Sequence, residues 1–332
     1  MKKSPFQNID PALKAEIKRE NQRYREAVSQ LEANMGHPDY GFFGPQSISW
    51  KIYREPAVVL GGMRAVLMQT AHPAIAQGVE ENSNFRNNLF MRGRRTIQAL
   101  YQLVFGNLTQ ARGLAARVYN VHHFVRGTVS NETNSRWSGA SYRANDPELL
   151  LWVAATVAET TLDLYQSLFY PLSPQEQMSY IEELNIGLTL NGLPKSDHFD
   201  STKHLKTYIN SVLEGSDLAV GPIGMGIAET LFTNRLTPSR FDERFTVGLL
   251  PGKIRDIYQI PWNDEKEGQH RKSLDRMRSA IHLIPGKLRY VPAYHQALVR
   301  ANQAAGHPPS RYGQVLSWVD RKFYVPLGLH AR

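Results

Sequence analysis

The segment from Asp146 to Phe169, DPELLLWVAATVAETTLDLYQSLF, is typical of a long and largely apolar helix. Aspartate followed by proline is a usual helix start, because proline fits the first helical position. The apolar run Leu149–Ala158 covers ten residues, which is about half the length that crosses a bilayer. Glu159 ends this run, and a carboxylate among apolar neighbours is expected either to pair with a buried arginine or to act as a base. We therefore expect a buried helix and no transmembrane segment.

Similar signals for helix starts and ends recur along the chain. Ser173-Pro174-Gln175-Glu176 is a capping box with proline at the first helical position. The polar segment 128–145 is predicted to form a long loop or an irregular hairpin, and loops of this length are often functional. The expected helices cover residues 11–35, 56–71, 73–81, 92–105, 109–127, 146–169, 173–192, 201–214, 223–235, 264–282 and 291–304.

This pattern predicts an all-α fold. No glycine-rich loop follows a strand and no Walker A sequence is present, which argues against a nucleotide-binding α/β fold. No shift in composition divides the chain into two parts. We expect a single large helical domain of about ten or more helices over residues 41–332, preceded by a helical arm over residues 1–40.

The composition limits the possible chemistry. The 332 residues include no cysteine, which excludes disulfides, thiolate zinc sites and cysteine nucleophiles. A metal would have to be held by the 11 histidines, by carboxylates or within a haem. The net charge is +9, but no zinc-finger, RNA-binding or recognition-helix pattern accompanies it, so we expect no nucleic-acid partner. The N-terminus lacks the apolar core of a signal peptide, and a cytoplasmic location is expected.

Apolar residues recur on one face of the expected helix 109–127. That face carries Leu114, Val118, Val121, His122 and Val125. His122 is therefore expected to point toward the core, with His123 turned about 100° away. A buried histidine must find partners for its ring nitrogens. A metal or a haem iron is one such partner and a backbone carbonyl is another, and the spacing does not choose between them.

The preceding helix, 92–105, shows the same pattern. Its apolar face carries Arg92, Thr96, Ala99, Leu100 and Leu103. Arg92 needs an anionic partner there, which could be Glu80, Glu81 or a cofactor carboxylate such as a haem propionate. Arg95 lies about 60° from this face, close enough to reach the same cavity edge. Two helices joined by so short a turn are expected to form an antiparallel hairpin, with Arg92, Thr96 and His122 lining one pocket.

His72 is a second candidate because it stands immediately before Pro73, where the helix has to end. Side chains at exposed helix ends often line functional sites. A histidine in this position could equally cap the last carbonyl groups of its helix.

Four motifs in order give the chain a resemblance to a known family. They are Leu60–Val79 (LGGMRAVLMQTAHPAIAQGV), Arg92–Thr96 (RGRRT), Val121–Gly127 (VHHFVRG) and Tyr142–Val153 (YRANDPELLLWV). The set resembles the catalytic domain shared by latex-clearing rubber oxygenases and the mycophenolate-pathway oxygenase. The likeness extends over roughly residues 45–300.

The resemblance implies an all-helical domain that encloses a b-type haem, with His122 at the position of the proximal iron ligand. Arg92 and Thr96 match an arginine and a threonine near the haem. Arg95 stands where rubber oxygenases carry a distal lysine, and since a guanidinium is a poor iron ligand, an open or water-filled distal side is expected. Ala154 stands where many relatives have a histidine.

The resulting hypothesis is a haem-b-dependent oxygenase or oxidoreductase that uses O₂ on a small apolar substrate, isoprenoid or lipid-like. His122 would bind the iron, and Arg92, Thr96 and His72 would complete the cofactor site. Arg92, Arg95 and Thr96 are the expected catalytic residues. The alternatives are a non-enzymatic protein of the same fold that binds haem or a small ligand, and a chain in which His122 is only a core residue.

Overall fold

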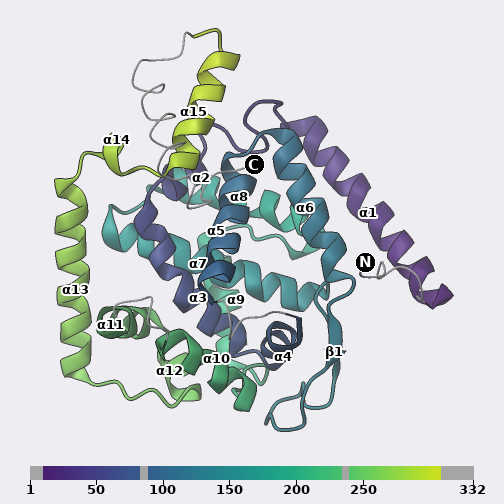
Figure 1. Cartoon of the computed structure of the whole chain (residues 1–332), viewed down its shortest axis with the longest axis vertical. Helices are drawn as coiled ribbons and strands as arrows, with labels where there is room; N and C mark the ends of the chain where they lie inside the picture. Colours follow the sequence, from purple (N-terminus) through teal and green to yellow (C-terminus); the bar gives the residue numbers. More distant parts are fainter. Residues whose placement is uncertain (1–9, 83–88, 234–238, 308–332) are drawn as a thin grey trace.

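The computed structural model describes residues 10–82, 89–233 and 239–307, and helices form almost all of its regular structure (Figure 1). The expected all-α class is confirmed. The helices are α1 (Pro11–Met35), α2 (Ile48–Tyr53), the 3₁₀ helix η1 (Pro56–Gly61), α3 (Gly62–Thr70), α4 (Pro73–Asn82), α5 (Leu89–Phe105), α6 (Leu108–His122), α7 (Pro147–Leu168), α8 (Pro174–Leu190), the 3₁₀ helix η2 (Lys195–Asp197), α9 (Thr202–Glu214), α10 (Pro222–Thr233), α11 (Ser239–Leu249), α12 (Gly252–Ile257), α13 (Asp264–Leu283), α14 (Gly286–Arg289) and α15 (Pro292–Ala304).

The two strands form a small hairpin after α6. β1 (Arg126–Thr128) pairs antiparallel with β2 (Ser141–Arg143), and Gly127 lies opposite Tyr142. The polar segment between α6 and α7 is therefore an irregular hairpin, as its composition predicted.

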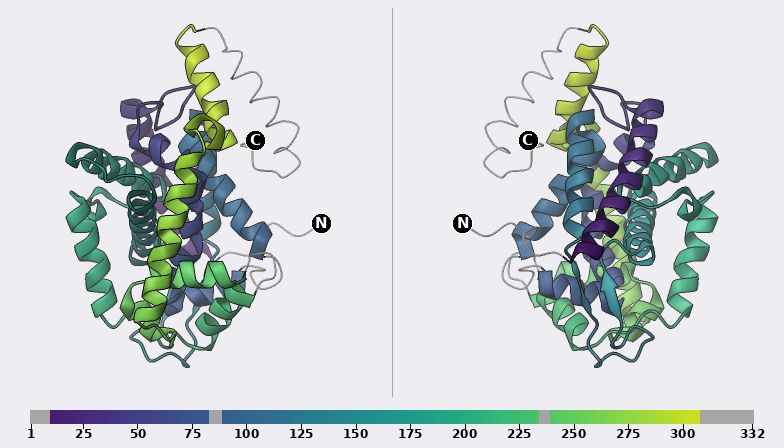
Figure 2. Two further views of the ribbon diagram at one scale, coloured as in Figure 1. Left: turned by 90° about the vertical axis from the view of Figure 1, so that its left-hand side faces the viewer. Right: turned by 90° about the vertical axis from the view of Figure 1, so that its right-hand side faces the viewer.

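Helix α7 is the centre of the domain. Its buried residues, from Leu149 to Leu168, include Trp152 and Tyr165, both almost completely inaccessible to solvent. It packs against α3, η1, α9 and α13. Figures 1 and 2 show it enclosed by other helices, while α1 and α13 lie at opposite edges of the molecule. The long apolar run seen in the sequence is thus explained by burial on several sides at once.

A buried ion pair fixes α3 against α7. Arg64 Nη2 lies 2.8 Å from Glu159 Oε2. The same guanidinium donates through Nε to the carbonyl oxygen of Leu249 at 2.7 Å, and its Nη1 donates to Thr160 Oγ1. The predicted pairing of Glu159 with a buried arginine is confirmed. This contact also connects the end of α11 to the centre of the domain.

The structure differs from the predicted helices mainly at their ends. The expected helix 56–71 is divided into η1 and α3, and the helix expected to reach Gly127 ends at His122. The short helices α2, α12 and α14 were not predicted, because elements of one or two turns carry too little periodicity to be recognised. The α11 helix was also missed.

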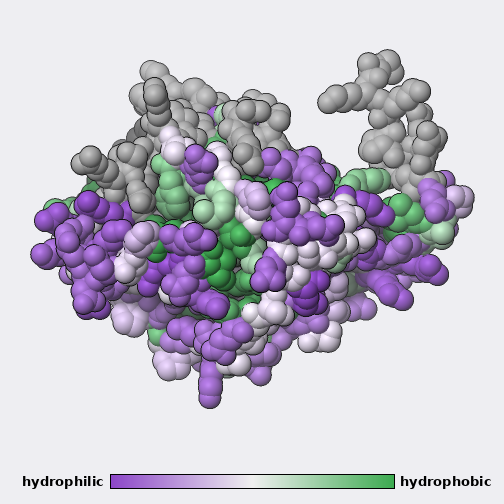
Figure 3. All heavy atoms as spheres, turned by 90° about the horizontal axis from the view of Figure 1, so that it is seen from below, coloured by the Kyte–Doolittle hydropathy of each residue, from purple (hydrophilic) through white to green (hydrophobic). Residues whose placement is uncertain are grey.

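The described surface is mostly hydrophilic. Seen from below, it carries charged and polar side chains around a small apolar patch (Figure 3). None of the helices in the described part of the chain has the combination of length and apolar character that spanning a bilayer requires.

The turn after α8 depends on glycine. Gly192 has φ +93°, and a Cβ placed there would lie 2.4 Å from Cε2 of Tyr119. The Tyr119 ring stacks on Tyr24 of α1 with centroids 4.0 Å apart, and Tyr24 Oη donates to the Leu190 carbonyl oxygen at 3.2 Å. A side chain at position 192 would therefore displace the contact that holds α1, α6 and α8 together.

We predict that Gly192→Ala lowers the free energy of unfolding by about 2 kcal/mol or more, through backbone strain and the clash with Tyr119. Gly113→Ala is the matched control, because a Cβ at Gly113 of α6 would meet no atom within 4 Å. That change should raise stability by roughly 0.5–1 kcal/mol. Urea unfolding of both variants checks this, and equal effects in the two would contradict the assigned role of Gly192.

Candidate functional site

An apolar cavity of about 230 Å³ lies between α5, α6, α7 and α8. His122, the last residue of α6, lines it together with Leu100 and Leu103 of α5. The small side chains of Ala154 and Ala158 form part of its wall on α7. Because most of the wall is aliphatic, the cavity suits an apolar ligand, and His122 brings an imidazole to it.

The structure corrects the predicted orientation of α6. Val121 is 55% exposed, whereas His123, which was expected to turn away from the core, is 4% exposed. Helix α1 covers the side that carries His123, where its Nε2 lies 3.1 Å from Asn21 Oδ1 and its Nδ1 lies 3.3 Å from Glu20 Oε2. His122 is half-buried and lines the cavity instead of filling the main core.

The His122 imidazole is held in its neutral form. Burial lowers its pKa, and the charge of His123 adds to this effect, while a hydrogen-bonding contact with Asn145 opposes it. Asn145 Nδ2 donates a hydrogen bond to the Tyr119 carbonyl oxygen at 3.2 Å. The other amide atom of this side chain, Oδ1, accepts no hydrogen bond from any described residue. Asn145 Oδ1 is thus an available acceptor near the His122 ring. A neutral imidazole is the form that binds a metal.

The predicted residues of α5, Arg92, Arg95 and Thr96, are not among the described residues that line the cavity. Arg92 is half-buried, and burial lowers its pKa. Thr96 and Arg95 are exposed, and the Thr96 hydroxyl donates to the Arg92 carbonyl oxygen at 3.1 Å. Helices α5 and α6 pack against each other across a short turn, as the predicted hairpin requires. Arg92 and His122 lie a similar number of residues from this turn, which brings them to the same level of the helix pair.

His72 does not line this cavity. It is 1% exposed and packs edge-to-face against Trp137, with ring centroids 4.9 Å apart. Neither ring nitrogen has a hydrogen-bond partner within the described residues. Burial lowers its pKa from 6.5 to about 4, so the ring is neutral near pH 7. The structure thus does not bring His72 together with His122.

Five polar residues that the spacing on α5 and α6 did not indicate also line the cavity. These are Ser49, Tyr53, Tyr180, Glu183 and Asn191. Glu183 accepts hydrogen bonds from the backbone N–H groups of Ile48 at 3.0 Å and Ser49 at 2.7 Å, at the start of α2. Burial raises the pKa of Glu183 in spite of these bonds. The carboxyl group therefore closes this part of the cavity and caps α2.

Helical spacing on α8 could have identified this wall. Tyr180, Leu184, Gly187 and Asn191 follow one another at intervals of four, three and four residues, and all of them line the cavity. The signal was weak because the face is a mixture of polar, apolar and small residues.

Metal binding by clustered side chains has no support in the described ranges, where no three His, Asp or Glu side chains gather around one point. A single imidazole beside an apolar cavity suits a metal that arrives within an organic cofactor.

We predict that His72→Phe flattens the acid dependence of stability. Between pH 6.5 and pH 4 the unfolded chain protonates His72 and the folded protein does not, so the free energy of unfolding falls as the pH falls through this window. Protonation of this one group in the unfolded chain lowers the free energy of unfolding by roughly 3 kcal/mol over the whole window. Urea unfolding across the window should show that His72→Phe loses less stability on acidification than the wild type by about this amount.

His204→Ala is the control for this comparison, because His204 lies on the exposed side of α9. This variant keeps the buried ring of His72, so its stability should still fall as the pH falls from 6.5 to 4. If His72→Phe keeps the wild-type slope, then His72 is not the neutral, buried group described above.

Comparisons with known proteins identify the family of the chain. A model of the family "ER-bound oxygenase mpaB/B'/Rubber oxygenase, catalytic domain" matches residues 50–282. An uncharacterised protein of Mycobacterium bovis and one of Mycobacterium tuberculosis are each 28% identical over 230 residues, which cover 66% of this chain and 87% of the relative. No solved structure gives a match. The chain belongs to the family of mpaB and rubber-oxygenase catalytic domains.

Proposed function

We propose that the protein is a haem-b-dependent oxygenase that uses O₂ to oxidise a small apolar substrate. The observation that carries this proposal is the neutral His122 imidazole in the wall of an apolar cavity. Membership of an oxygenase family supports the class of reaction. The aliphatic wall supports the class of substrate.

The residues around His122 fit a haem by their chemistry. A single neutral imidazole could hold the iron of a haem, and Asn145 Oδ1 is an available acceptor beside it. Arg92, on the neighbouring helix and at the same level, carries a charge that suits a propionate. The volume, about 230 Å³, is below the roughly 300 Å³ at which ligand pockets usually begin. The surrounding helices would therefore have to open further to admit a whole macrocycle.

Each residue then has a separate task. His122 would hold the iron, and Asn145 would accept the other N–H of the ring and fix its orientation. Arg92 would anchor a propionate, and Thr96 would line the entrance beside it. Arg95, exposed on the next turn, would remain a charge at the rim. The aliphatic side chains of α5 and α7 exclude water from the substrate. Bound haem supplies the O₂ chemistry.

We predict that purified protein binds hemin and gains a Soret band, and that His122→Ala abolishes this band or weakens hemin binding at least about a hundredfold, because the axial bond is lost. His204→Ala, on the exposed side of α9, should bind hemin like the wild type. Absorption titration with hemin measures both. A wild-type protein that takes up no hemin would exclude the haem-dependent function.

Oxygen consumption with candidate isoprenoids or lipids separates an enzyme from a carrier. An oxygenase consumes O₂ when both hemin and substrate are present. A protein that binds hemin but consumes no O₂ with any of them would support the non-enzymatic alternative.

Asn145→Leu should weaken hemin binding by about 10–100-fold, since the hydrogen-bond partners of metal-binding histidines contribute this much. Asn191→Leu is a comparison elsewhere in the cavity wall, where Asn191 Nδ2 donates to the Gly187 carbonyl oxygen at 2.8 Å. It alters the polarity of the cavity and leaves Asn145 in place. Equal losses in the two variants would argue against a specific role for Asn145.

A further inference from the structure

The end of α13 and the short helix α14 carry an exposed cluster of apolar side chains. Leu283 is 83% exposed and Leu288 is 67% exposed, which makes them the two most exposed large apolar residues in the described part of the chain. Ile284 beside them is 48% exposed. Single apolar residues are ordinary at a protein surface, whereas a cluster of them indicates an interaction site. We call Leu283, Ile284 and Leu288 the apolar tip.

The turn that presents the apolar tip is held in place by Arg289. Its Nε lies 2.6 Å from Glu55 Oε2 and its Nη2 lies 2.9 Å from Glu55 Oε1, and these two side chains are only 16% and 4% exposed. The same guanidinium donates through Nη1 to the carbonyl oxygen of Ile284 at 2.8 Å. A bidentate ion pair of this kind fixes geometry. The exposure of the tip is therefore built into the fold and does not result from a frayed helix end.

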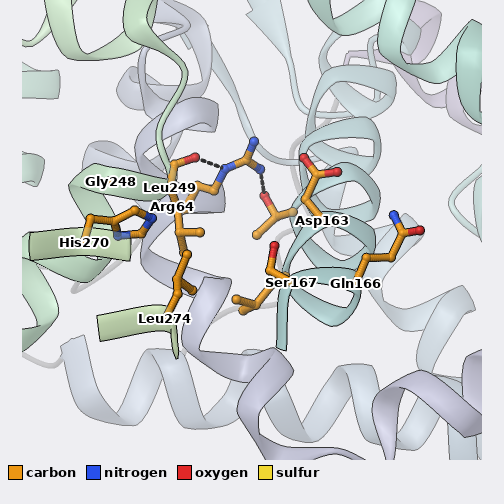
Figure 4. Close-up of a pocket in the computed structure, with 10 residues that line it drawn as sticks. Arg64, Asp163, Gln166, Ser167, Gly248, Leu249, His270 and Leu274 are labelled. Atoms are coloured by element: carbon orange, nitrogen blue, oxygen red, sulfur yellow. Dashed lines mark hydrogen bonds between the residues drawn. The ribbon is translucent and has the colours of Figure 1, made fainter. Parts of the chain in front are cut away.

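The inner face of α13 is turned toward the centre of the domain. A polar cleft of about 410 Å³ lies there, with His270 and Leu274 of α13 on one side and Asp163 and Ser167 of α7 on the other (Figure 4). Because His270 and Leu274 are four residues apart, they mark one face of the helix. The opposite face, which carries Lys272, points to solvent at the edge of the molecule (Figure 2).

This outer face of α13 carries positive charge next to the apolar tip. Lys272 and Arg276 precede Leu283 by eleven and seven residues, which places the three side chains on one side of the helix. Both cations are exposed, and neither forms an ion pair with a described residue. Positions 271–289 include six basic residues and a single acidic one, Asp275, which lies 3.7 Å from Arg278. The surface beside the tip is therefore basic.

A basic surface with an apolar tip fits the boundary of an acidic lipid membrane better than it fits a macromolecule. A stable dimer buries about 800 Å² on each partner, which three aliphatic side chains do not supply, and the positive charge would repel a second copy. A nucleic acid would engage the cations and leave the tip in water. At a membrane, aliphatic side chains enter the boundary of the acyl chains while Lys and Arg stay among the headgroups.

We propose that the apolar tip and the outer face of α13 dock on an acidic lipid membrane. The tip enters the interfacial region, and Lys272 and Arg276 contact the anionic headgroups. Arg276 lies about 10 Å along the helix axis from Leu283, so a helix that lies along the surface brings both side chains to it at once. This docking surface goes beyond the proposed oxygenase activity and does not depend on it.

Co-sedimentation of the full-length protein with lipid vesicles tests the proposal. We expect binding to phosphatidylcholine vesicles that contain about a third phosphatidylserine, and at least about tenfold weaker binding to phosphatidylcholine alone. The double change Leu283→Ser/Leu288→Ser should weaken binding to the acidic vesicles about tenfold or more, because apolar burial is lost. The double change Lys272→Gln/Arg276→Gln should weaken it by about fivefold for each charge removed.

Met35→Ser and Lys18→Gln are the matched controls, because both side chains are exposed on α1, at the opposite edge of the molecule (Figure 1). Each control should bind the acidic vesicles like the wild type. Leu288→Trp gives a second readout, since its added fluorescence should shift to shorter wavelength on acidic vesicles. Heparin, which offers anionic groups without a lipid phase, should cause no such shift.

A protein that stays in solution with acidic vesicles would overturn the proposal, and so would binding that Leu283→Ser/Leu288→Ser leaves unchanged. Light scattering tests for a second copy as the occupant. If the wild type is a dimer and the leucine variant a monomer, the tip is an interface between copies and the membrane assignment is wrong. Because none of these measurements uses hemin, failure of the oxygenase function would leave them interpretable.

Discussion

The ion pair between Arg64 and Glu159 is the contact on which the arrangement of the domain depends. The two side chains are 6% and 12% exposed, so an unpaired charge at either position would cost about 3–5 kcal/mol. Arg64 satisfies three separate partners, on α7 and at the end of α11, with one planar group. The guanidinium fixes the distance and rotation of α3 relative to α7 more strictly than aliphatic packing alone can do. The position of α7 then determines both cavities.

Helix α7 separates two chemically different spaces. Ala154 and Ala158 face the apolar cavity of His122, whereas Asp163 and Ser167, further along the helix, line the polar cleft. Small residues make room on the first face, and residues with hydrogen-bonding side chains line the second. Both spaces therefore depend on the position of one buried helix.

Local signals in the sequence predicted the helices whose starts carry proline or a capping box, such as α7 and α8, and they predicted the pairing of Glu159. They did not predict which face of α6 is buried. Helical spacing placed Val121 and His122 inward, but α1, about a hundred positions away, covers the opposite side through Tyr24 and Asn21. Contacts with elements that are distant in the sequence determine which face of a helix is buried, and the sequence of the helix itself does not reveal these contacts. Tyr180 and Glu183 were missed for a different reason, because the face of α8 that carries them mixes polar, apolar and small residues.

The two histidines of the family motifs show how burial separates structural from chemical roles. His72 and His122 both stand within motifs, and both have lowered pKa values because burial disfavours the charged ring. His72, however, is enclosed by Trp137 and its surroundings, so a ligand could reach it only if the core opened. His122 lies in the wall of a space that a ligand can occupy. A ligand can reach an imidazole only where the ring borders such a space, and of the two histidines His122 meets this requirement.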